Sequence, residues 1–362
     1  MDIFLILSTA VELGASDIHI VPGFPPMIRI VGEIIPLENF GIITPEQAKV
    51  MIYGVLYEEQ QRKFEEILEL DCSYDIKNVS RFRVNVFLHK DGVGAAFRVI
   101  TSKIPTPEEL MLTDTITELA FLTKGLVLLS GPTGSGKSTT IASLIEYINQ
   151  RKKVRILTIE DPVEFVYERK LSVITQREVG NQTYSFSNAL KSALREDPDV
   201  IFVGEMRDLE TISLALTAAE TGHLVFSTLH TPDAPQSIDR IIDVFPSYQQ
   251  QQIRVQLAGT LRAIICQHLL SRPDGMGRVA AREILIVTPG ISNLIRENKT
   301  HQIYSAIETG ARLGMITMDR HLAELVKQEL VTMEEAYTRA NDPEQFKKYA
   351  IGDNVKAGRM WW

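Results

Sequence analysis

The sequence is poor in the features that mark secreted, zinc-binding and membrane-spanning proteins. It has only two cysteines, Cys72 and Cys266, which lie far apart and outside any CxxC spacing. Neither a disulfide framework nor a cysteine zinc site is therefore expected. No apolar run approaches the roughly 18 residues of a membrane-spanning helix. We expect a protein of the reducing cytoplasm that reaches the inner face of a membrane only through partners.

An excess of basic residues is also lacking. The 38 Lys and Arg residues are outnumbered by 46 Asp and Glu residues, so the formal net charge is -8. Broad nucleic-acid surfaces neutralise phosphates with clustered Lys and Arg, so this composition argues against that class while leaving room for a narrow basic channel. Otherwise the composition is that of an ordinary globular protein, and 362 residues predict two or three domains.

Residues 1–100 predict a small α+β domain. Apolar residues recur every four positions at the N-terminus, where no basic segment precedes them, so we expect a short amphipathic helix rather than a signal peptide. Residues 45–69 have helical spacing, whereas 81–87 alternate like a strand and 95–100 read as a second strand that a turn joins to the first.

Residues 101–115 contain two prolines among polar residues and predict an interdomain linker. From 116 to 288, apolar strands alternate with helical patterns, which predicts an α/β domain with a parallel sheet covered by helices. The expected strands are 126–129, 155–159, 200–203 and 224–227. Residues 289–350 read as helical. Residues 351–362 read as a tail in which Trp361 and Trp362 are either disordered or dock a partner.

The most informative motif fits the phosphate-loop pattern G-x-x-x-x-G-K-[ST] between an apolar strand and an amphipathic helix. Its backbone N–H groups and the helix N-terminus are suited to phosphate oxygens. Lys137 is expected to reach the β- and γ-phosphates of ATP, and Ser138 to hold Mg²⁺. The expected nucleotide-binding residues are Gly131, Pro132, Thr133, Gly134, Ser135, Gly136, Lys137, Ser138 and Thr139.

Carboxylates follow two of the later strands, at the sheet edge where ligands bind in such folds. Glu160, Asp161 and Glu164 are either catalytic or, since Pro162 follows Asp161, the capped start of a helix. Glu205 stands where phosphate-loop enzymes usually carry the aspartate that serves Mg²⁺. It either acts through a metal-bound water or caps the next helix.

Two further groups have a structural and a functional interpretation. His230 follows the strand 224–227 with Ser227 and Thr228, where a sensor of the γ-phosphate is expected, although single histidines are often structural. Arg81, Arg83 and Arg98 lie on the two neighbouring strands of the first domain. They form either a solvated face or a set of groups that stabilise phosphate charge.

Together these segments resemble the secretion-type hexameric ATPases and, among them, the twitching-motility (PilT-type) type IV pilus retraction ATPases. The resemblance extends over nearly the whole chain. It rests on segments 14–19, 131–139, 155–165, 176–180, 197–208, 221–231, 291–297 and 314–319. Segment 291–297 resembles a signature tied to retraction, with Ser292 where arginine is usual. The tetracysteine module and the long N-terminal extension usual in assembly and secretion relatives are missing, which favours retraction.

The resemblance implies a PAS-like first domain, a RecA-like second domain and a ring of six subunits that hydrolyses ATP with Mg²⁺. It implies that Glu164 activates the attacking water, that Glu205 supports Mg²⁺ and that water, and that the three arginines reach phosphates between the domains. An inner-membrane pilus platform protein is the implied partner. Three other interpretations remain open: an accessory retraction paralogue, an ATP-binding regulator and a DNA translocase.

Overall fold

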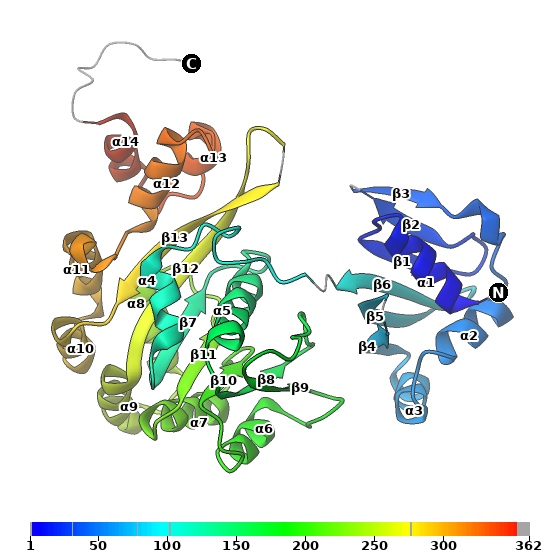
Figure 1. Ribbon diagram of the computed structural model, residues 1–362, viewed down its shortest axis with the longest axis horizontal. Coiled ribbons are helices and arrows are strands. Elements are labelled where there is room, and N and C mark those ends of the chain that lie inside the picture. The colour runs from blue at the N-terminus through cyan, green and yellow to red at the C-terminus, as the bar shows by residue number, and fades with distance from the viewer. Residues whose placement is uncertain (1, 31, 78, 101–102, 276, 353–362) are drawn as a thin grey trace. The chain divides into compact units, whose positions relative to one another are not determined.

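The computed structural model describes residues 2–30, 32–77, 79–100, 103–275 and 277–352 (Figure 1). The chain divides into two units, one of residues 1–103 with 162–166 and one of residues 104–161 with 167–362. The expected tail that carries Trp361 and Trp362 lies outside the described residues. In the described part of the chain, no helix combines the length and the apolar character needed to cross a bilayer.

The first unit is an antiparallel sheet with helices. The strands follow the order β3-β2-β1-β6-β5-β4, and α1 (Ile3–Glu12) is the predicted N-terminal helix. The other elements are β1 (Asp17–Ile20), β2 (Met27–Ile30), β3 (Glu33–Pro36), α2 (Pro45–Tyr53), α3 (Glu58–Ile67), β4 (Glu69–Ile76), β5 (Ser80–His89) and β6 (Gly92–Ile100). On β5, Phe82, Val84 and Val86 point into the core, so the residues between them face outward.

The second unit is built on a seven-stranded sheet in the order β13-β12-β7-β11-β10-β8-β9. Its strands are β7 (Gly125–Ser130), β8 (Arg155–Glu160), β9 (Val173–Glu178), β10 (Val200–Val203), β11 (Leu224–Thr228), β12 (Leu261–Ser271) and β13 (Arg278–Ile286). The four predicted strands are confirmed as β7, β8, β10 and β11, and the predicted parallel pairing holds between all neighbours from β12 to β9. β13 is antiparallel to β12.

Three strands of this sheet escaped the sequence prediction. β9 has no residue in the core until its last position, so it lacks the apolar run of a central strand. β12 and β13 are long mixed runs of apolar and polar residues, and periodicity alone cannot separate such runs from buried helices. In Figure 1 these two strands form the yellow hairpin at one edge of the sheet.

The central strands carry apolar residues on both faces of the sheet, and helices cover both faces. Val127 and Leu129 pack with α4 (Asp114–Glu118) and α5 (Lys137–Arg151) on one face. Leu126 and Leu128 pack on the other face. The helices there are α6 (Phe186–Ala193), α7 (Leu209–Glu220), α8 (Ala234–Asp243), α9 (Ser247–Thr260), α10 (Pro289–Arg296) and α11 (Ile303–Thr309). This is the predicted α/β arrangement. The loops that follow β7, β8, β10 and β11 lie at the carboxyl ends of these strands.

The C-terminal part is helical, as predicted. The helices α12 (Met318–Lys327), α13 (Met333–Tyr337) and α14 (Pro343–Ile351) share a core with the far end of the β12–β13 hairpin. Met318, Leu322 and Leu325 form the buried face of α12. The hairpin therefore connects the central sheet to the C-terminal helices.

Candidate nucleotide site

The phosphate loop joins β7 to α5 in a conformation that requires glycine. Gly131 and Gly136 have φ angles of +132° and +84°, a region that side chains disfavour. A Cβ atom on Gly131 would also lie only 2.3 Å from the backbone oxygen of Gln267. Since α5 begins at Lys137, the free N–H groups of its first turn face the loop. The result is a site suited to an anion.

Lys137 is buried within this loop, with 7% of its surface exposed. Its Nζ donates hydrogen bonds to the backbone oxygens of Gly131 at 2.7 Å and Pro132 at 2.9 Å. The ammonium group is thereby held over the loop by neutral acceptors. Phosphate oxygens carry charge and bind an ammonium group more strongly than carbonyl oxygens do.

Of the carboxylates after β8, Glu160 and Glu164 differ in environment. Glu160 is buried and accepts a hydrogen bond from Thr158 Oγ1 at 2.6 Å. Glu164 is exposed and lies in residues 162–166, which group with the first unit. Residues 161–172 are all described and form no helix. The alternative in which Asp161 caps a helix is therefore wrong, because the chain continues as an extended loop to β9.

Glu205 follows β10 and is not a helix cap. The cap of α7 is Asp208, whose side chain accepts from the backbone N–H of Thr211 at 2.9 Å. Glu205 instead pairs with Arg207, with Nε and Oε1 2.8 Å apart. Its other oxygen, Oε2, lies 3.8 Å from Nε2 of His230. The carboxylate is therefore held at the edge of the sheet rather than used in a helix terminus.

His230 and His223 lie at opposite ends of β11 and have different environments. His223 Nδ1 is 2.9 Å from the backbone oxygen of Ala218, a local structural contact. His230 is exposed beside Glu205. Partial burial and then the charge of Lys137 lower the pKa of His230, although Glu205 acts in the opposite direction. The lowered pKa favours the neutral form of the imidazole, and Lys137, Glu205 and His230 share one electrostatic environment.

Ser227 and Thr228 do not follow the strand, as the sequence suggested, but are its last two residues. Their hydroxyls donate to the backbone oxygens of Val203 at 2.8 Å and Gly204 at 2.5 Å. These side chains therefore link the end of β11 to the end of β10, directly before Glu205. A role as direct phosphate sensors does not fit the bonds they make.

In the first unit, the three arginines lie on the outward face of the sheet. Arg83 and Arg98 are direct cross-strand partners, and both are exposed. Arg98 Nε lies 2.8 Å from Asp17 Oδ1, and Arg81 Nη2 donates to Ser73 Oγ at 2.9 Å. Although partial burial alone would raise it, hydrogen bonds from Arg98 and Ser16 lower the pKa of Asp17. Arg83 is the arginine most available for a further ligand.

The predicted magnesium ligands suit an ion that arrives with a nucleotide. Among the described residues, no group of three or more His, Cys, Asp or Glu side chains could hold a metal ion. Mg²⁺ usually keeps several waters and takes one or two protein ligands together with substrate phosphates. A hydroxyl from Ser138, in the first turn of α5, and a nearby carboxylate fit that requirement better than they fit a resident metal centre.

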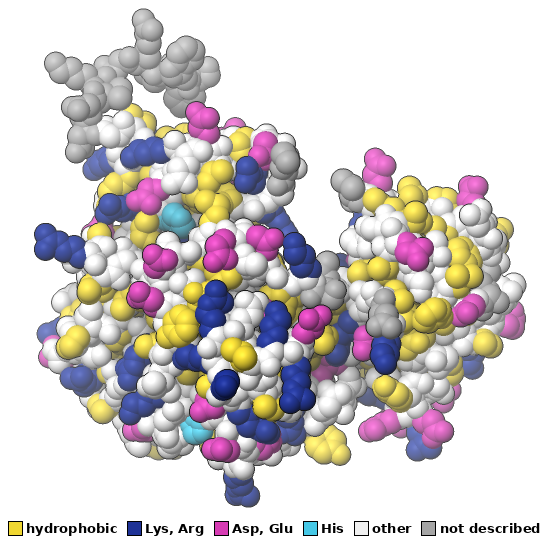
Figure 2. Space-filling view, in the orientation of Figure 1, with side chains coloured by type: hydrophobic (Ala, Val, Ile, Leu, Met, Phe, Trp, Pro, Cys, Tyr) yellow, Lys and Arg dark blue, Asp and Glu magenta, His cyan; other side chains and the backbone are white. Residues whose placement is uncertain are grey.

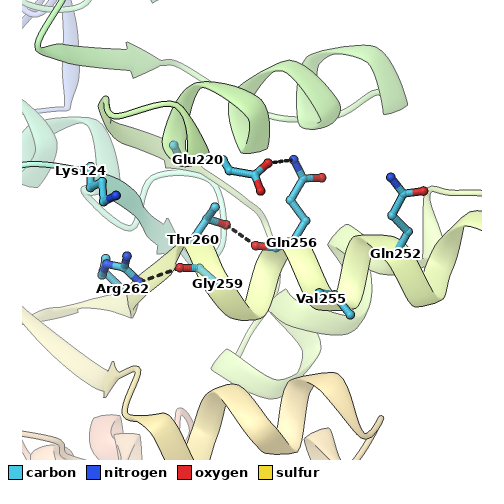
Figure 3. Close-up of a pocket in the computed structure, with 9 residues that line it drawn as sticks. Lys124, Glu220, Gln252, Val255, Gln256, Gly259, Thr260 and Arg262 are labelled. Atoms are coloured by element: carbon cyan, nitrogen blue, oxygen red, sulfur yellow. Dashed lines mark hydrogen bonds between the residues drawn. The ribbon is translucent and has the colours of Figure 1, made fainter.

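A separate pocket of about 510 Å³ opens at the amino ends of the same strands (Figure 3). Lys124 precedes β7, and Arg262 is the second residue of β12. Glu220 accepts from Gln256 Nε2 at 2.9 Å at its rim. The phosphate loop follows the other end of β7, about 20 Å away at the usual rise of a strand. The pocket is thus distinct from the nucleotide site.

Three residues near the loop were missed by sequence reasoning. Arg207 pairs with Glu205. Gln267 on β12 bonds the loop at Ser135, and Arg282 on β13 bonds Gln267. The short separation of Glu205 and Arg207, two positions apart in the sequence, could have suggested the first. Gln267 and Arg282 carry no local signal, since β12 and β13 themselves were not predicted.

Comparison with known proteins identifies close relatives. Residues 102–356 match the type II/IV secretion system protein family. The type IV pilus retraction ATPase PilT of Pseudomonas aeruginosa is 51% identical over 96% of this chain and 100% of its own length. A twitching motility protein of Neisseria gonorrhoeae is 51% identical over 88% of this chain and 85% of its own length. The fold matches a crystal structure of the pilus retraction motor PilT with bound ADP. That match has a TM-score of 0.90 and 50% identity, and covers 95% of this chain and 98% of that one.

Proposed function

Because this chain belongs to the type II/IV secretion system protein family, we propose that it is a motor ATPase that couples ATP hydrolysis to retraction of a type IV pilus. Half of its residues are identical to those of a retraction ATPase over almost the full length of both chains. That similarity is the observation that carries the proposal. The glycine-dependent loop around Lys137 supplies the chemistry that such a motor needs.

Binding begins at the phosphate loop. The phosphates of ATP replace the carbonyl oxygens of Gly131 and Pro132 as acceptors for Lys137, and charge makes them the stronger acceptors. The backbone N–H groups of the loop and of the first turn of α5 would bind the β-phosphate. Mg²⁺ would be held by Ser138 directly and by Glu205 through water, and it would neutralise part of the phosphate charge.

Hydrolysis then requires a water molecule placed in line with the γ-phosphate. We assign the base to Glu164, which is exposed and free of the helix that Asp161 might have started. Glu205 orients that water, and the neutral imidazole of His230 reports on the γ-phosphate from its place beside Glu205. Arg81, Arg83 and Arg98 neutralise the charge that develops on the phosphates.

The same proposal includes a ring of six subunits that works at the cytoplasmic face of the cell membrane. The partner there is an inner-membrane platform protein of the pilus. A DNA translocase of similar build is disfavoured, because Lys and Arg side chains of the larger unit are interspersed with Asp and Glu on the face in view (Figure 2). Net charge -8 supports the same conclusion.

Complementation tests the proposal directly. A bacterium that lacks its retraction ATPase, but still assembles pili, should regain twitching when it expresses this chain. Expression of the Lys137→Ala variant should leave it non-motile with pili extended. If the wild-type chain hydrolyses ATP in vitro yet never restores retraction, the motor assignment fails while the enzymatic one stands.

A further inference from the structure

The phosphate loop contacts one residue of β12, Gln267, at both of its ends. Cys266 is the parallel partner of Ser130 at the end of β7, so Gln267 comes next to Gly131, where the loop starts. The Gln267 backbone oxygen closely approaches Gly131. At the other end of the loop, a Cβ atom on Gly136 would lie 2.9 Å from Gln267 Nε2. Both ends of the loop therefore rest on Gln267.

The side chain of Gln267 also bonds the loop. It is 1% exposed, and its Nε2 donates to the backbone oxygen of Ser135 at 2.6 Å. Its Oε1 accepts from Thr140 Oγ1 in the first turns of α5 at 3.0 Å. One amide group thus fixes the distance between the loop and the start of α5. That distance sets where the N–H groups of residues 136–138 point.

Arg282 holds Gln267 in place. The two residues are antiparallel partners on β13 and β12, and Arg282 Nε donates to Gln267 Oε1 at 3.0 Å. Arg282 is 2% exposed, and burial lowers its pKa to about 10. Within the described residues, its guanidinium forms no ion pair with a carboxylate. A buried charge without a counter-ion is unfavourable, so the hydrogen bonds that Arg282 donates have to offset the cost of its burial.

The remaining donors of Arg282 reach a turn that lies within the predicted linker. Nη2 donates to the backbone oxygen of Leu110 at 2.9 Å, and Nη1 to that of Met111 at 3.2 Å. Met111 has a φ angle of +52°, which is unfavourable for a residue with a side chain. Backbone bonds from Leu110 to Thr106 and from Leu112 to Pro107 close this turn. The planar guanidinium therefore joins the turn at 106–112 to the support of the phosphate loop.

We infer that Gln267 is a positioning residue for the phosphate loop and that Arg282 couples it to the turn at 106–112. The inference rests on the proposed ATPase function. When phosphates bind, the loop and Gln267 settle into one arrangement, and Arg282 transmits that arrangement to the turn. Conversely, a displacement of the turn changes the affinity of the loop for nucleotide, as linkage requires.

The first test measures ADP affinity with a fluorescent ADP analogue. Gln267→Glu keeps the size and the acceptor oxygens but removes the donor to Ser135, so we expect at least tenfold weaker binding with the fold retained. Arg282→Lys keeps the charge and loses the forked geometry, and should weaken binding by a smaller factor. Gln256→Met and Arg278→Met, in the same unit and away from the loop, serve as matched controls and should bind as the wild type does.

A merely structural role gives a different pattern. In that case Gln267→Glu lowers the melting temperature, while the folded protein binds ADP with wild-type affinity, and the inference is wrong. Failure of the wild type itself to bind ADP would instead overturn the proposed function. The two failures are therefore distinguishable in one titration series.

The second test measures hydrogen exchange of the amides at 106–112. ADP should slow their exchange in the wild type and leave it unchanged in Arg282→Lys. A double-mutant cycle with Gln267→Met and Arg282→Met should give an affinity loss close to that of Gln267→Met alone, because Arg282 acts on the loop through Gln267. Exchange at 106–112 that ignores ADP in the wild type would contradict the coupling even if the Arg282 variants failed to fold.

Discussion

The lysine of the phosphate loop and the arginines of the first unit carry the same charge in opposite environments. Lys137 is buried and already bonded to two carbonyl oxygens of its own loop. Arg83 lies exposed on the outward face of β5. The ammonium group of Lys137 is already positioned by its own loop, so little has to move when a phosphate binds. Arg83 has no such positioning and can act only when a phosphate is brought to it. The two regions are therefore expected to respond differently to mutation and to assembly.

The largest effect is expected from Lys137→Ala. It removes the only buried ammonium group in the loop, and losses of about 10²–10³-fold or more are typical when one preorganised charge donor is deleted. Phosphate release should become undetectable above background. The matched control is Lys124→Ala, directly before the amino end of β7, which should keep full turnover. Equal activity in both variants would refute the assignment of the nucleotide site.

Glu164→Gln should give the next largest loss. Removal of a general base typically lowers turnover by about 10²-fold or more, while nucleotide binding should persist because Glu164 lies outside the loop. The measurement is single-turnover hydrolysis together with ATP affinity. Glu168→Gln, at another exposed glutamate of the same loop, is the control. Weakened ATP binding with unchanged chemistry would assign Glu164 to binding instead.

Arg83→Ala should lower turnover by about 10- to 100-fold, the range of a lost charge-assisted hydrogen bond. Arg98→Ala should cost less, because part of the interaction energy of Arg98 is already committed to Asp17. Steady-state hydrolysis at saturating ATP checks both. Arg62→Ala, an exposed arginine on α3, is the control. If Arg83→Ala and Arg98→Ala both match the wild type, the arginine face is simply solvated.

The smallest effect on activity, but a clear one on stability, is expected at His321. Burial, and then the charge of Arg282, lowers the pKa of His321 to about 4, below its ordinary value of about 6.5. Folding therefore disfavours the protonated form, and its stabilising contribution is complete above pH 6.5 and lost as the pH falls toward 4. The loss is at most about 3 kcal/mol.

Denaturant unfolding between pH 7 and pH 4 measures this term. His321 Nδ1 accepts from the backbone N–H of Arg282 at 2.8 Å, a bond that His321→Asn could retain without titrating. The wild type should lose more stability than His321→Asn across that interval. Parallel pH profiles for the two proteins would show that His321 does not titrate in this range.

The same contrast explains what could be predicted from the sequence. The phosphate loop is a local motif in which spacing alone dictates glycine positions, and β7, β8, β10 and β11 are apolar runs with clear boundaries. Glu205 and His230 were predicted separately because each follows a strand. Their proximity depends on the pairing of β11 with β10. The sequence predicted a parallel sheet but not which strands are neighbours in it.

The support of the loop could not be predicted. Gln267 and Ser135 are 132 residues apart, and nothing in the local sequence of β12 marks a glutamine that faces a glycine loop. Arg282 and Met111 are joined by a contact of the same kind over 171 residues. Such contacts follow from strand order, and the hairpin that makes them has a mixed apolar and polar pattern that is not diagnostic of strands.

The most direct test of the account is Mg²⁺-dependent phosphate release per subunit as the protein concentration is raised, for the wild type and Arg83→Ala side by side. The account predicts that specific activity of the wild type climbs and reaches a plateau as subunits assemble, and that Arg83→Ala stays low at every concentration. Activity that is independent of concentration and equal in the two proteins would contradict it. The phosphate loop would then be sufficient by itself, and the exposed arginines would have no part in catalysis.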